Sequence, residues 1–354
     1  MILPSLAHTG PILVARDIVK FIKDKVDLID VYYFDAIEQV SFDCNTHRIN
    51  FDTSIPFEEY DIVHSHMFRP DKYLAKHTST ANIISISTVH CDIRKDLRYN
   101  YNFLVSLIFR HVWLSYFKKM DALIMISNSL YSSFYNKKVD NNNVYTILNG
   151  RTIRSIEAVP SDHIVLLESL KEKYKIIGSC ALLTKRKGLH LIIRALPNLP
   201  DYVFVVVGEG KELDNLKSLA RKLSVDGRCF FLGFQKGAES YVNYFDVYAM
   251  PSLFEGFGLA LIEATLFKKS CICSSIPVFK ELFNDNEVTF FDVSNTKSLV
   301  DAIKQAYDRR DLLGELAYSK SVEKYSLEVM GQKYHNVYKK LINDRIHKRI
   351  NSSL

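Results

Sequence analysis

Glycine is scarce in this chain: it supplies 13 of 354 residues, which is about half of the usual ~7%. Residues 1–149 contain a single glycine, Gly10. Hydrophobic residues make up 47% of the chain and charged residues 24%, which excludes collagen-like, low-complexity and disordered chains. A chain of 354 residues is long enough for two domains of roughly 150 residues each.

The sequence also lacks the features of secreted, disulfide-linked or membrane-spanning proteins. Its cysteines form no C-x-x-C pair, and a chain of this length needs no disulfides, so we expect a cytoplasmic protein in a reducing compartment. No basic segment followed by an apolar run opens the chain, so no signal peptide is expected. The longest apolar stretch, 103–117, contains Arg110 and His111 and is too short to span a bilayer. The six cysteines are Cys44, Cys91, Cys180, Cys229, Cys271 and Cys273, of which the last two are expected to be buried thiols.

Metal ligands with a diagnostic spacing are missing as well. No Asp-x-Asp motif occurs, and His64 and His66, which alternate onto one face of a strand, have no third ligand at a suitable spacing. We therefore expect no metal and no other cofactor. The net charge of +6 lies wholly after residue 150, because the first 150 residues carry 16 basic and 16 acidic side chains. So small an excess favours one anionic ligand over nucleic acid.

Short β-rich apolar runs alternate with helical patterns along the whole chain, which predicts parallel sheets covered on both faces. A polar stretch after Gly150 separates two such series, so we expect an α/β protein with two doubly wound domains, 1–150 and 151–326. A last helix, 327–354, is expected to pack back toward the first domain. Residues 40–51 are expected to form a hairpin, and an opening strand is almost absent before Pro4. The predicted strands are 30–34, 62–64, 83–89, 122–126, 144–148, 177–182, 203–207, 229–232, 247–250, 270–274 and 288–291, and the predicted helices of the first domain are 11–23, 70–77, 102–119 and 129–135.

Glycine placement marks the C-terminal domain as the better candidate for a binding site. Several of its glycines directly follow predicted strands, where the carboxyl ends of a parallel sheet form the ligand crevice. Gly208-Glu209-Gly210 is half of a dinucleotide fingerprint, with Leu213 in place of the third glycine. Contact with a phosphate and a simple tight turn both stay open for this segment.

Residues 251–264 read P-S-L-F-E-G-F-G-L-A-L-I-E-A. Glu255 falls in a glycine-rich loop, and Glu263 falls inside a helix that begins near Gly258, so both carboxylates are expected on the crevice side. A carboxylate accepts directed hydrogen bonds from sugar or ribose hydroxyls. The alternative interpretation is a pair of solvated acids near a helix start, which the helix dipole favours.

This segment belongs to an ordered set of motifs. N-G at 149–150, K-G at 187–188, G-E-G at 208–210, D-V-Y-A-M-P-S at 246–252 and the segment just described follow one another, and D-I-V-H-S-H at 61–66 and T-V-H at 88–90 are fainter. The set resembles the retaining GT-B glycosyltransferases of family 4 (glycosyl transferases group 1). The resemblance implies a GT-B architecture, in which two Rossmann-like domains face across a cleft and the C-terminal one binds the nucleotide sugar.

The resemblance also implies roles for individual residues. Glu263 would hold the donor ribose, Glu255 the donor sugar and Lys187 the diphosphate, while His90 would lie near the reacting carbon. Together, Glu255, Lys187 and His90 form the implied catalytic group. The remaining implied contacts are Arg186, Gly208, Gly210, Phe257, Gly258 and Leu259 with the donor, and Gly10, at a helix start suited to anions, with the diphosphate or the acceptor.

One position departs from the family's pattern. Many members carry arginine five residues before the lysine, and here that position is Leu182. Lys185 or Arg186 could supply the missing positive charge, and Arg186 is the better candidate because its planar guanidinium can bridge two phosphate oxygens.

Residues 103–119 support two interpretations. Apolar side chains lie on most faces of the predicted helix, which favours a buried helix of the N-terminal domain. Trp113, with Lys118 and Lys119 at the helix end, instead suits a shallow peripheral contact with a membrane.

The sequence thus predicts a hexosyltransferase that moves a sugar from a UDP- or GDP-sugar to a saccharide or lipid-linked saccharide acceptor, in the synthesis of O-antigen, capsule or lipopolysaccharide. Lys187 and backbone N–H groups would stabilise the leaving diphosphate without a metal. Two alternatives stay open: a GT-B nucleotide-sugar epimerase, and a catalytically idle subunit that only binds nucleotide.

Overall fold

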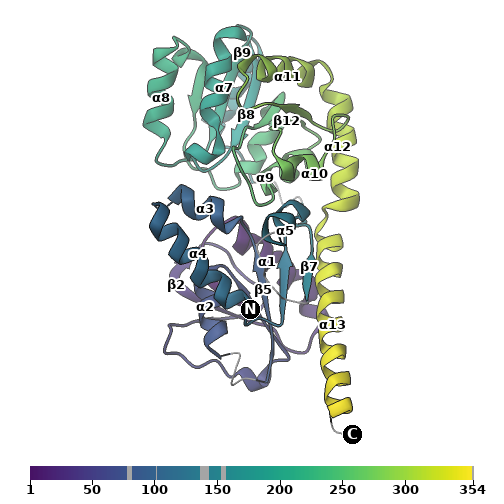
Figure 1. Cartoon of the computed structure of the whole chain (residues 1–354). Helices are drawn as coiled ribbons and strands as arrows, with labels where there is room; N and C mark the ends of the chain where they lie inside the picture. The colour runs from purple at the N-terminus through teal and green to yellow at the C-terminus, as the bar shows by residue number, and fades with distance from the viewer. Residues whose placement is uncertain (78–81, 101, 136–142, 153–156, 353–354) are drawn as a thin grey trace. The chain divides into compact units, whose positions relative to one another are not determined.

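The computed structural model describes residues 1–77, 82–100, 102–135, 143–152 and 157–352. The chain divides into two compact units, Met1–Gly150 with Tyr325–Leu354, and Arg151–Lys324. We call them unit 1 and unit 2. Each is built on one parallel β-sheet with helices packed against it (Figure 1). The predicted α/β class with two doubly wound domains is confirmed.

Unit 1 contains a seven-stranded sheet in the order β3-β2-β1-β4-β5-β6-β7. The strand order reverses between β1 and β4, and the loops after their carboxyl ends therefore border the usual position of a ligand site in such a sheet. Its elements are β1 (Ile2–Leu6), α1 (Gly10–Ile22), β2 (Asp30–Glu38), β3 (Asn45–Arg48), β4 (Ile62–His66), α2 (Phe68–His77), β5 (Ile84–Val89), α3 (Ile93–Asn100), α4 (Phe103–Phe117), β6 (Ala122–Met125), α5 (Asn128–Tyr135), β7 (Val144–Thr146) and α13 (Leu327–Ser352).

Two sequence predictions for unit 1 are wrong. The segment 40–51 forms no hairpin, because β3 pairs with β2 in parallel, with Asp30 opposite Asn45. The opening strand is not a stub but a five-residue strand that continues through Pro4. Residues of β1 pair with β2 from Ile2 to Leu6, whereas only Ile2 pairs with β4. Proline has no N–H to donate to a ladder, so a strand containing it can pair fully on one side only.

Unit 2 contains a six-stranded sheet in the order β10-β9-β8-β11-β12-β13. Here the order reverses between β8 and β11, and β9 is buried along its whole length. The elements are α6 (Ser161–Lys171), β8 (Lys175–Cys180), α7 (Leu189–Ala195), β9 (Tyr202–Val207), α8 (Leu213–Lys222), β10 (Cys229–Phe231), β11 (Val247–Met250), α9 (Leu259–Leu266), β12 (Ser270–Ser274), α10 (Pro277–Leu282), β13 (Thr289–Phe291), α11 (Thr296–Asp308) and α12 (Arg310–Lys324). Cys271 and Cys273 are buried free thiols in β12, as predicted.

The last helix, α13, belongs to unit 1 and packs on α1. A Cβ added at Gly331 would lie 2.2 Å from the ring of Phe21, so only glycine permits this approach. Two buried tyrosines of α13, Tyr334 and Tyr338, reach the side chains of His64 and Thr88 on the sheet. The C-terminal segment is thus part of the core of unit 1.

The helix α4 buries side chains in its C-terminal half and exposes apolar ones at its start. Trp113 is buried and donates its indole N–H to Asp71 at 2.7 Å, so the predicted membrane contact through Trp113 is wrong. The first two turns of the helix nevertheless expose large apolar side chains, Leu104 and Ile108 among them. No helix in the described part of the chain is long and apolar enough to cross a membrane.

Candidate active site

Two loops meet at the strand-order reversal of unit 2. One follows β8 and carries Lys187, and the other follows β11 and carries Glu255. The loops are packed together at Gly188, whose φ is +67° and whose added Cβ would lie 1.9 Å from the carbonyl oxygen of Pro251. The N–H of Leu253 donates to the carbonyl oxygen of Arg186 at 2.8 Å. This backbone contact holds the side chains of the two loops against each other.

Glu255 is the centre of a small ionic cluster, which we call the Lys187–Glu255 cluster: Arg186, Lys187, Ser252 and Glu255. Lys187 Nζ lies 2.7 Å from Glu255 Oε1, and an Arg186 guanidinium nitrogen lies 3.3 Å from Oε2. Ser252 Oγ donates to Oε1 at 2.9 Å. The carboxylate is only 7% exposed. Burial by itself would raise the pKa of Glu255, but Lys187 and Arg186 outweigh it and hold this pKa below the ordinary value.

The basic residues of this loop differ in position. Arg186 is partly buried, with its guanidinium 5.5 Å from the ring centre of Phe254, whereas Lys185 is exposed. Leu182 is 61% exposed and supplies no charge. Two cations and one carboxylate give the cluster a positive balance, which suits an anionic ligand. Of the two candidates for the missing arginine, the structure brings Arg186 to the cluster and leaves Lys185 outside it.

The glycines at 208 and 210 have a structural role of their own. Gly208 has φ +138°, and an added Cβ would lie 2.0 Å from the carbonyl oxygen of Ala181 in the neighbouring loop. At Gly210 the corresponding atom is the carbonyl oxygen of Leu183, at 2.5 Å. Both glycines therefore allow the loop after β9 to lie directly on the loop after β8. This packing accounts for them without a phosphate.

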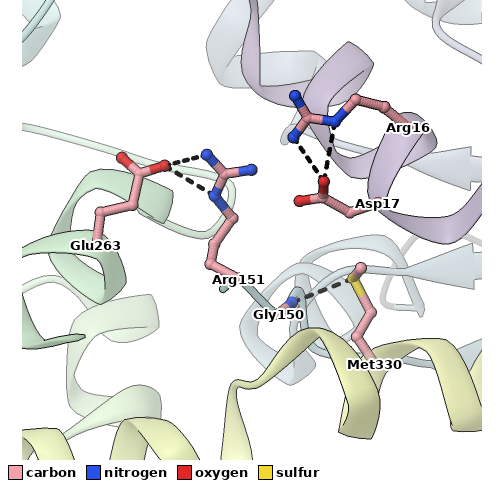
Figure 2. Close-up of polar contacts among 6 residues, drawn as sticks. All are labelled: Arg16, Asp17, Gly150, Arg151, Glu263 and Met330. Atoms are coloured by element: carbon pink, nitrogen blue, oxygen red, sulfur yellow. Dashed lines mark hydrogen bonds and ion pairs between the residues drawn. The ribbon is translucent and has the colours of Figure 1, made fainter. Parts of the chain in front are cut away.

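Glu263 lies in α9, whose first residue is Leu259 and whose N-cap is Gly258 in the left-handed region. Phe257, just before the cap, is buried. Glu263 Oε1 accepts from Arg151 Nε at 2.8 Å and contacts a second nitrogen of the same guanidinium (Figure 2). The Glu263 side chain is 27% exposed, and that of Arg151 only 6%. A ligand can therefore reach the glutamate, while the arginine behind it is enclosed.

In unit 1, Gly10 is the first residue of α1, directly after the N-cap Thr9. No acidic residue occupies the first turn of this helix, which leaves the partial positive charge of its N-terminus uncompensated. One turn further on, Arg16 donates to Asp17 from two nitrogens (Figure 2). The structure thus places Gly10 at a helix start after the carboxyl end of β1, as the sequence predicts.

A cluster of imidazoles lies at the carboxyl ends of β4 and β5. We call it the histidine cluster: His64, His66, Thr88 and His90. His90 Nε2 lies 2.8 Å from His66 Nδ1, and the rings of His64 and His66 are 4.4 Å apart between centres. His64 bonds Tyr338 through Nδ1 at 2.6 Å and Thr88 through Nε2 at 2.7 Å.

Burial governs the ionisation of this cluster. Desolvation lowers the pKa of His90 to about 3. It also lowers the pKa values of His64 and His66 well below their usual range, and the neighbouring positive charges lower them further. All three imidazoles are therefore neutral at physiological pH. A neutral His90 can donate a hydrogen bond from one ring nitrogen and accept one at the other.

Sequence reasoning missed several residues that complete these sites. Arg151 and Ser252 hold the two glutamates of unit 2, and His66 holds His90. The motif D-I-V-H-S-H contains His66, so its partnership with His90 could have been predicted from two strands that pair in register. Nothing in the sequence around Arg151 indicates a partner 112 positions away. Among the described residues, no group of three or more histidine, cysteine or carboxylate side chains is arranged to hold a metal ion.

Comparison with known proteins identifies the family. Residues 167–343 match the model of glycosyl transferases group 1. The O-antigen biosynthesis glycosyltransferase WclY of Escherichia coli is 30% identical over 360 residues, which cover 97% of this chain and 98% of WclY. The chain belongs to the glycosyl transferases group 1 family. It is therefore a glycosyltransferase.

Further relatives agree with this assignment. Anabaena HepE, solved with UDP, has a TM-score of 0.81 at 19% identity, with 96% of this chain and 98% of that one covered. Sucrose-phosphate synthase from Thermosynechococcus elongatus has the same TM-score, 0.81, at 16% identity, with 97% and 98% covered. These likenesses confirm the GT-B fold. A Campylobacter jejuni enzyme named as an N-acetylgalactosaminyltransferase acting on a diphospho-undecaprenol-linked saccharide is 33% identical over 141 residues, 39% of each chain.

Proposed function

We propose that this glycosyltransferase moves a sugar from a UDP- or GDP-sugar to an acceptor hydroxyl with retention of the anomeric configuration, as a GT-B enzyme of family 4. The observation that carries the proposal is the Lys187–Glu255 cluster at the strand-order reversal of unit 2. It combines positive charge for a diphosphate with a carboxylate for sugar hydroxyls. The Arg151–Glu263 pair adds a second, partly exposed carboxylate for the ribose.

In this proposal the residues of unit 2 stabilise the departing nucleotide. Negative charge on the diphosphate grows as its bond to the sugar breaks, and Lys187 and Arg186 are fixed cations that favour that charge. Glu255 orients the sugar through its hydroxyls. In unit 1, the neutral His90 would hydrogen-bond a sugar hydroxyl near the reacting carbon, and the N-terminus of α1 at Gly10 would bind the diphosphate or the acceptor.

No metal takes part in the proposed reaction. Lys187 and Arg186 would supply the charge stabilisation that a divalent ion gives in other transferases. Turnover should therefore survive EDTA, measured as release of nucleoside diphosphate. Loss of turnover with EDTA and its recovery with Mg²⁺ or Mn²⁺ would show that the fixed cations are insufficient.

We propose a saccharide or lipid-linked saccharide of O-antigen, capsule or lipopolysaccharide synthesis as the acceptor. The names of the Escherichia coli and Campylobacter jejuni relatives support this class, and the second names an undecaprenol-linked acceptor. Such acceptors lie in the cytoplasmic membrane, so the proposed location is the cytoplasm, with peripheral contact at the inner face of that membrane.

The test uses the full chain. A thermal-shift series of nucleotide sugars identifies the donor, because a bound ligand raises the apparent stability. Transfer to a lipid-linked saccharide is then measured, and proton NMR of the new linkage reports its configuration. Inversion contradicts the proposed mechanism. Donor consumption without an acceptor indicates an epimerase, and donor binding without turnover indicates an idle subunit.

A further inference from the structure

The start of α4 carries an apolar stripe that no other described part of unit 1 covers. Leu104 is 70% exposed, Ile108 64%, Phe103 56% and Leu107 42%. The spacing of these residues places all four on one side of two helical turns. The opposite side of the helix is buried, at Ser106, Trp113 and Phe117. Single exposed apolar residues are ordinary on a protein surface, but a contiguous group marks an interaction site.

Positive charge is concentrated around this stripe. Residues 93–119 contain six basic side chains and one acidic one, Asp96, although residues 1–150 as a whole are neutral. Arg94, Lys95 and Arg98 are exposed on α3, which packs against α4. The guanidinium carbon of Arg98 lies 5.4 Å from the ring centre of Phe103, so the charged and apolar groups are adjacent. Lys118 and Lys119 extend the basic surface just beyond the other end of α4.

We infer that this surface docks on an anionic lipid bilayer. We call it the α3–α4 face: Phe103, Leu104, Leu107 and Ile108 with Arg94, Lys95 and Arg98. An apolar stripe bordered by basic residues is the pattern of a helix that lies in the membrane interface, where the stripe enters the acyl boundary and the cations contact lipid phosphates. We choose the bilayer as the partner because six basic side chains against one acidic side chain in residues 93–119 complement the phosphates of anionic lipids.

The inference deepens the proposed function by naming the surface that would bring the enzyme to a lipid-linked acceptor. Its biological purpose rests on that function, but the binding does not. Membrane binding is measured without a sugar donor or an acceptor. The docking surface and the proposed sugar transfer are therefore tested independently.

Flotation of the full chain with phosphatidylcholine vesicles, with and without phosphatidylglycerol, tests the inference. We expect binding to the anionic vesicles only, and binding that weakens with salt. Leu104→Ser/Ile108→Ser should reduce the partition coefficient by about tenfold or more. Arg94→Gln/Lys95→Gln/Arg98→Gln should reduce it by at least about tenfold and make it less dependent on salt, because each cation near an anionic surface contributes severalfold.

Matched controls change equally exposed residues in unit 2. Val165→Ser/Leu312→Ser removes two apolar side chains that are 67% and 54% exposed, and Lys217→Gln/Lys297→Gln/Lys304→Gln removes three exposed cations. Both controls should float like the wild type. A positive readout comes from Leu104→Trp, whose fluorescence should be quenched by brominated lipids, whereas that of Val165→Trp should not.

Three results would overturn the inference. One is a wild-type chain that does not float with anionic vesicles. Another is equal loss of binding in the control variants. The third is a wild-type dimer in sedimentation that Leu104→Ser/Ile108→Ser dissociates while vesicle binding is absent, which would make the face a contact between copies. Vesicle binding by a chain that transfers no sugar would instead contradict the proposed function and leave the docking surface intact.

Discussion

Arg151 binds Glu263 through a single carboxylate oxygen. Its Nε lies 2.8 Å from Glu263 Oε1, and a second guanidinium nitrogen contacts the same atom (Figure 2). The structure shows no hydrogen bond from a described residue to Oε2. One oxygen is therefore fixed by an enclosed arginine, while the other can accept from a hydroxylated ligand. We expect this arrangement to orient the carboxylate before a nucleotide binds.

The first prediction concerns this pair. Glu263→Gln should weaken UDP or GDP binding by about 1.5–3 kcal/mol, the scale of a charge-assisted hydrogen bond. Arg151→Ala should weaken binding by a smaller amount, because the carboxylate remains but loses its orientation. Titration calorimetry measures both effects, with Glu323→Gln on the exposed side of α12 as the control. Unchanged affinity in Glu263→Gln, when the wild type binds one of the nucleotides, would exclude the ribose role.

The second prediction concerns the cation that we propose in place of the arginine absent at position 182. Arg186→Ala should reduce kcat/KM by about 10²–10³, comparable to the loss of one donor to the transition state. Lys185→Ala should cost less than about tenfold, because this side chain is exposed and lies outside the Lys187–Glu255 cluster. Steady-state kinetics on both variants decides between them. A larger effect of Lys185→Ala would reassign the role, and no effect of either would leave Lys187 and the backbone to bind the diphosphate.

The strands and glycine-bearing loops of unit 2 were predictable because apolar runs and strand-end glycines are local signals. The segment 251–264 also led directly to Glu255 and Glu263. The pairings of these residues were not predictable. Arg151 meets Glu263 only because the chain folds back over 112 positions, and local pattern carries no information on such a contact.

Errors in unit 1 have similar physical origins. The few residues before Pro4 predict at most a stub of a strand, yet β1 runs from Ile2 to Leu6 and pairs with β2 on both sides of Pro4. The segment 40–51 was expected to turn back on itself, but β3 joins the sheet in parallel. The helix α3 was missed because it is short and largely polar. The sequence also suits Trp113 as a membrane anchor, because it cannot show the buried Asp71 that the indole contacts.

The third prediction concerns the bond between His66 and His90. If His66 orients His90, His66→Asn should keep much of the activity, because an asparagine amide can occupy the position of Nδ1. His66→Ala should lower kcat by about tenfold or more with little change in KM, since the lost contact acts on the transition state. His90→Ala should cost more than His66→Ala. Equal effects of His66→Asn and His66→Ala on kcat would show that His66 serves stability rather than position.

The last prediction concerns stability against pH. In the folded chain the pKa of His90 is about 3, and those of His64 and His66 also lie well below 6.5. Below pH 6.5 the unfolded chain therefore binds protons that the folded chain does not, and the free energy of unfolding falls as the pH falls. For each histidine, the free energy of unfolding falls by up to about 1.4 kcal/mol per pH unit. For the three together, the fall is up to about 4 kcal/mol per pH unit. This stability is present above pH 6.5 and is lost progressively toward pH 3.

One buried carboxylate opposes this trend. Desolvation raises the pKa of Asp71 to about 6, despite hydrogen bonds from Ser65, Ser87 and Trp113. Between about pH 6 and pH 4 the folded chain thus holds one proton at Asp71 that the unfolded chain lacks. The three histidines and Asp71 together therefore lower the free energy of unfolding by up to about 2.7 kcal/mol per pH unit. Urea unfolding of the wild type at several pH values between 7.5 and 5 measures the slope. His66→Gln should reduce it by about one proton, or ~1.4 kcal/mol per unit, because glutamine does not titrate. A slope that is unchanged in this variant would mean that His66 is protonated in the folded chain.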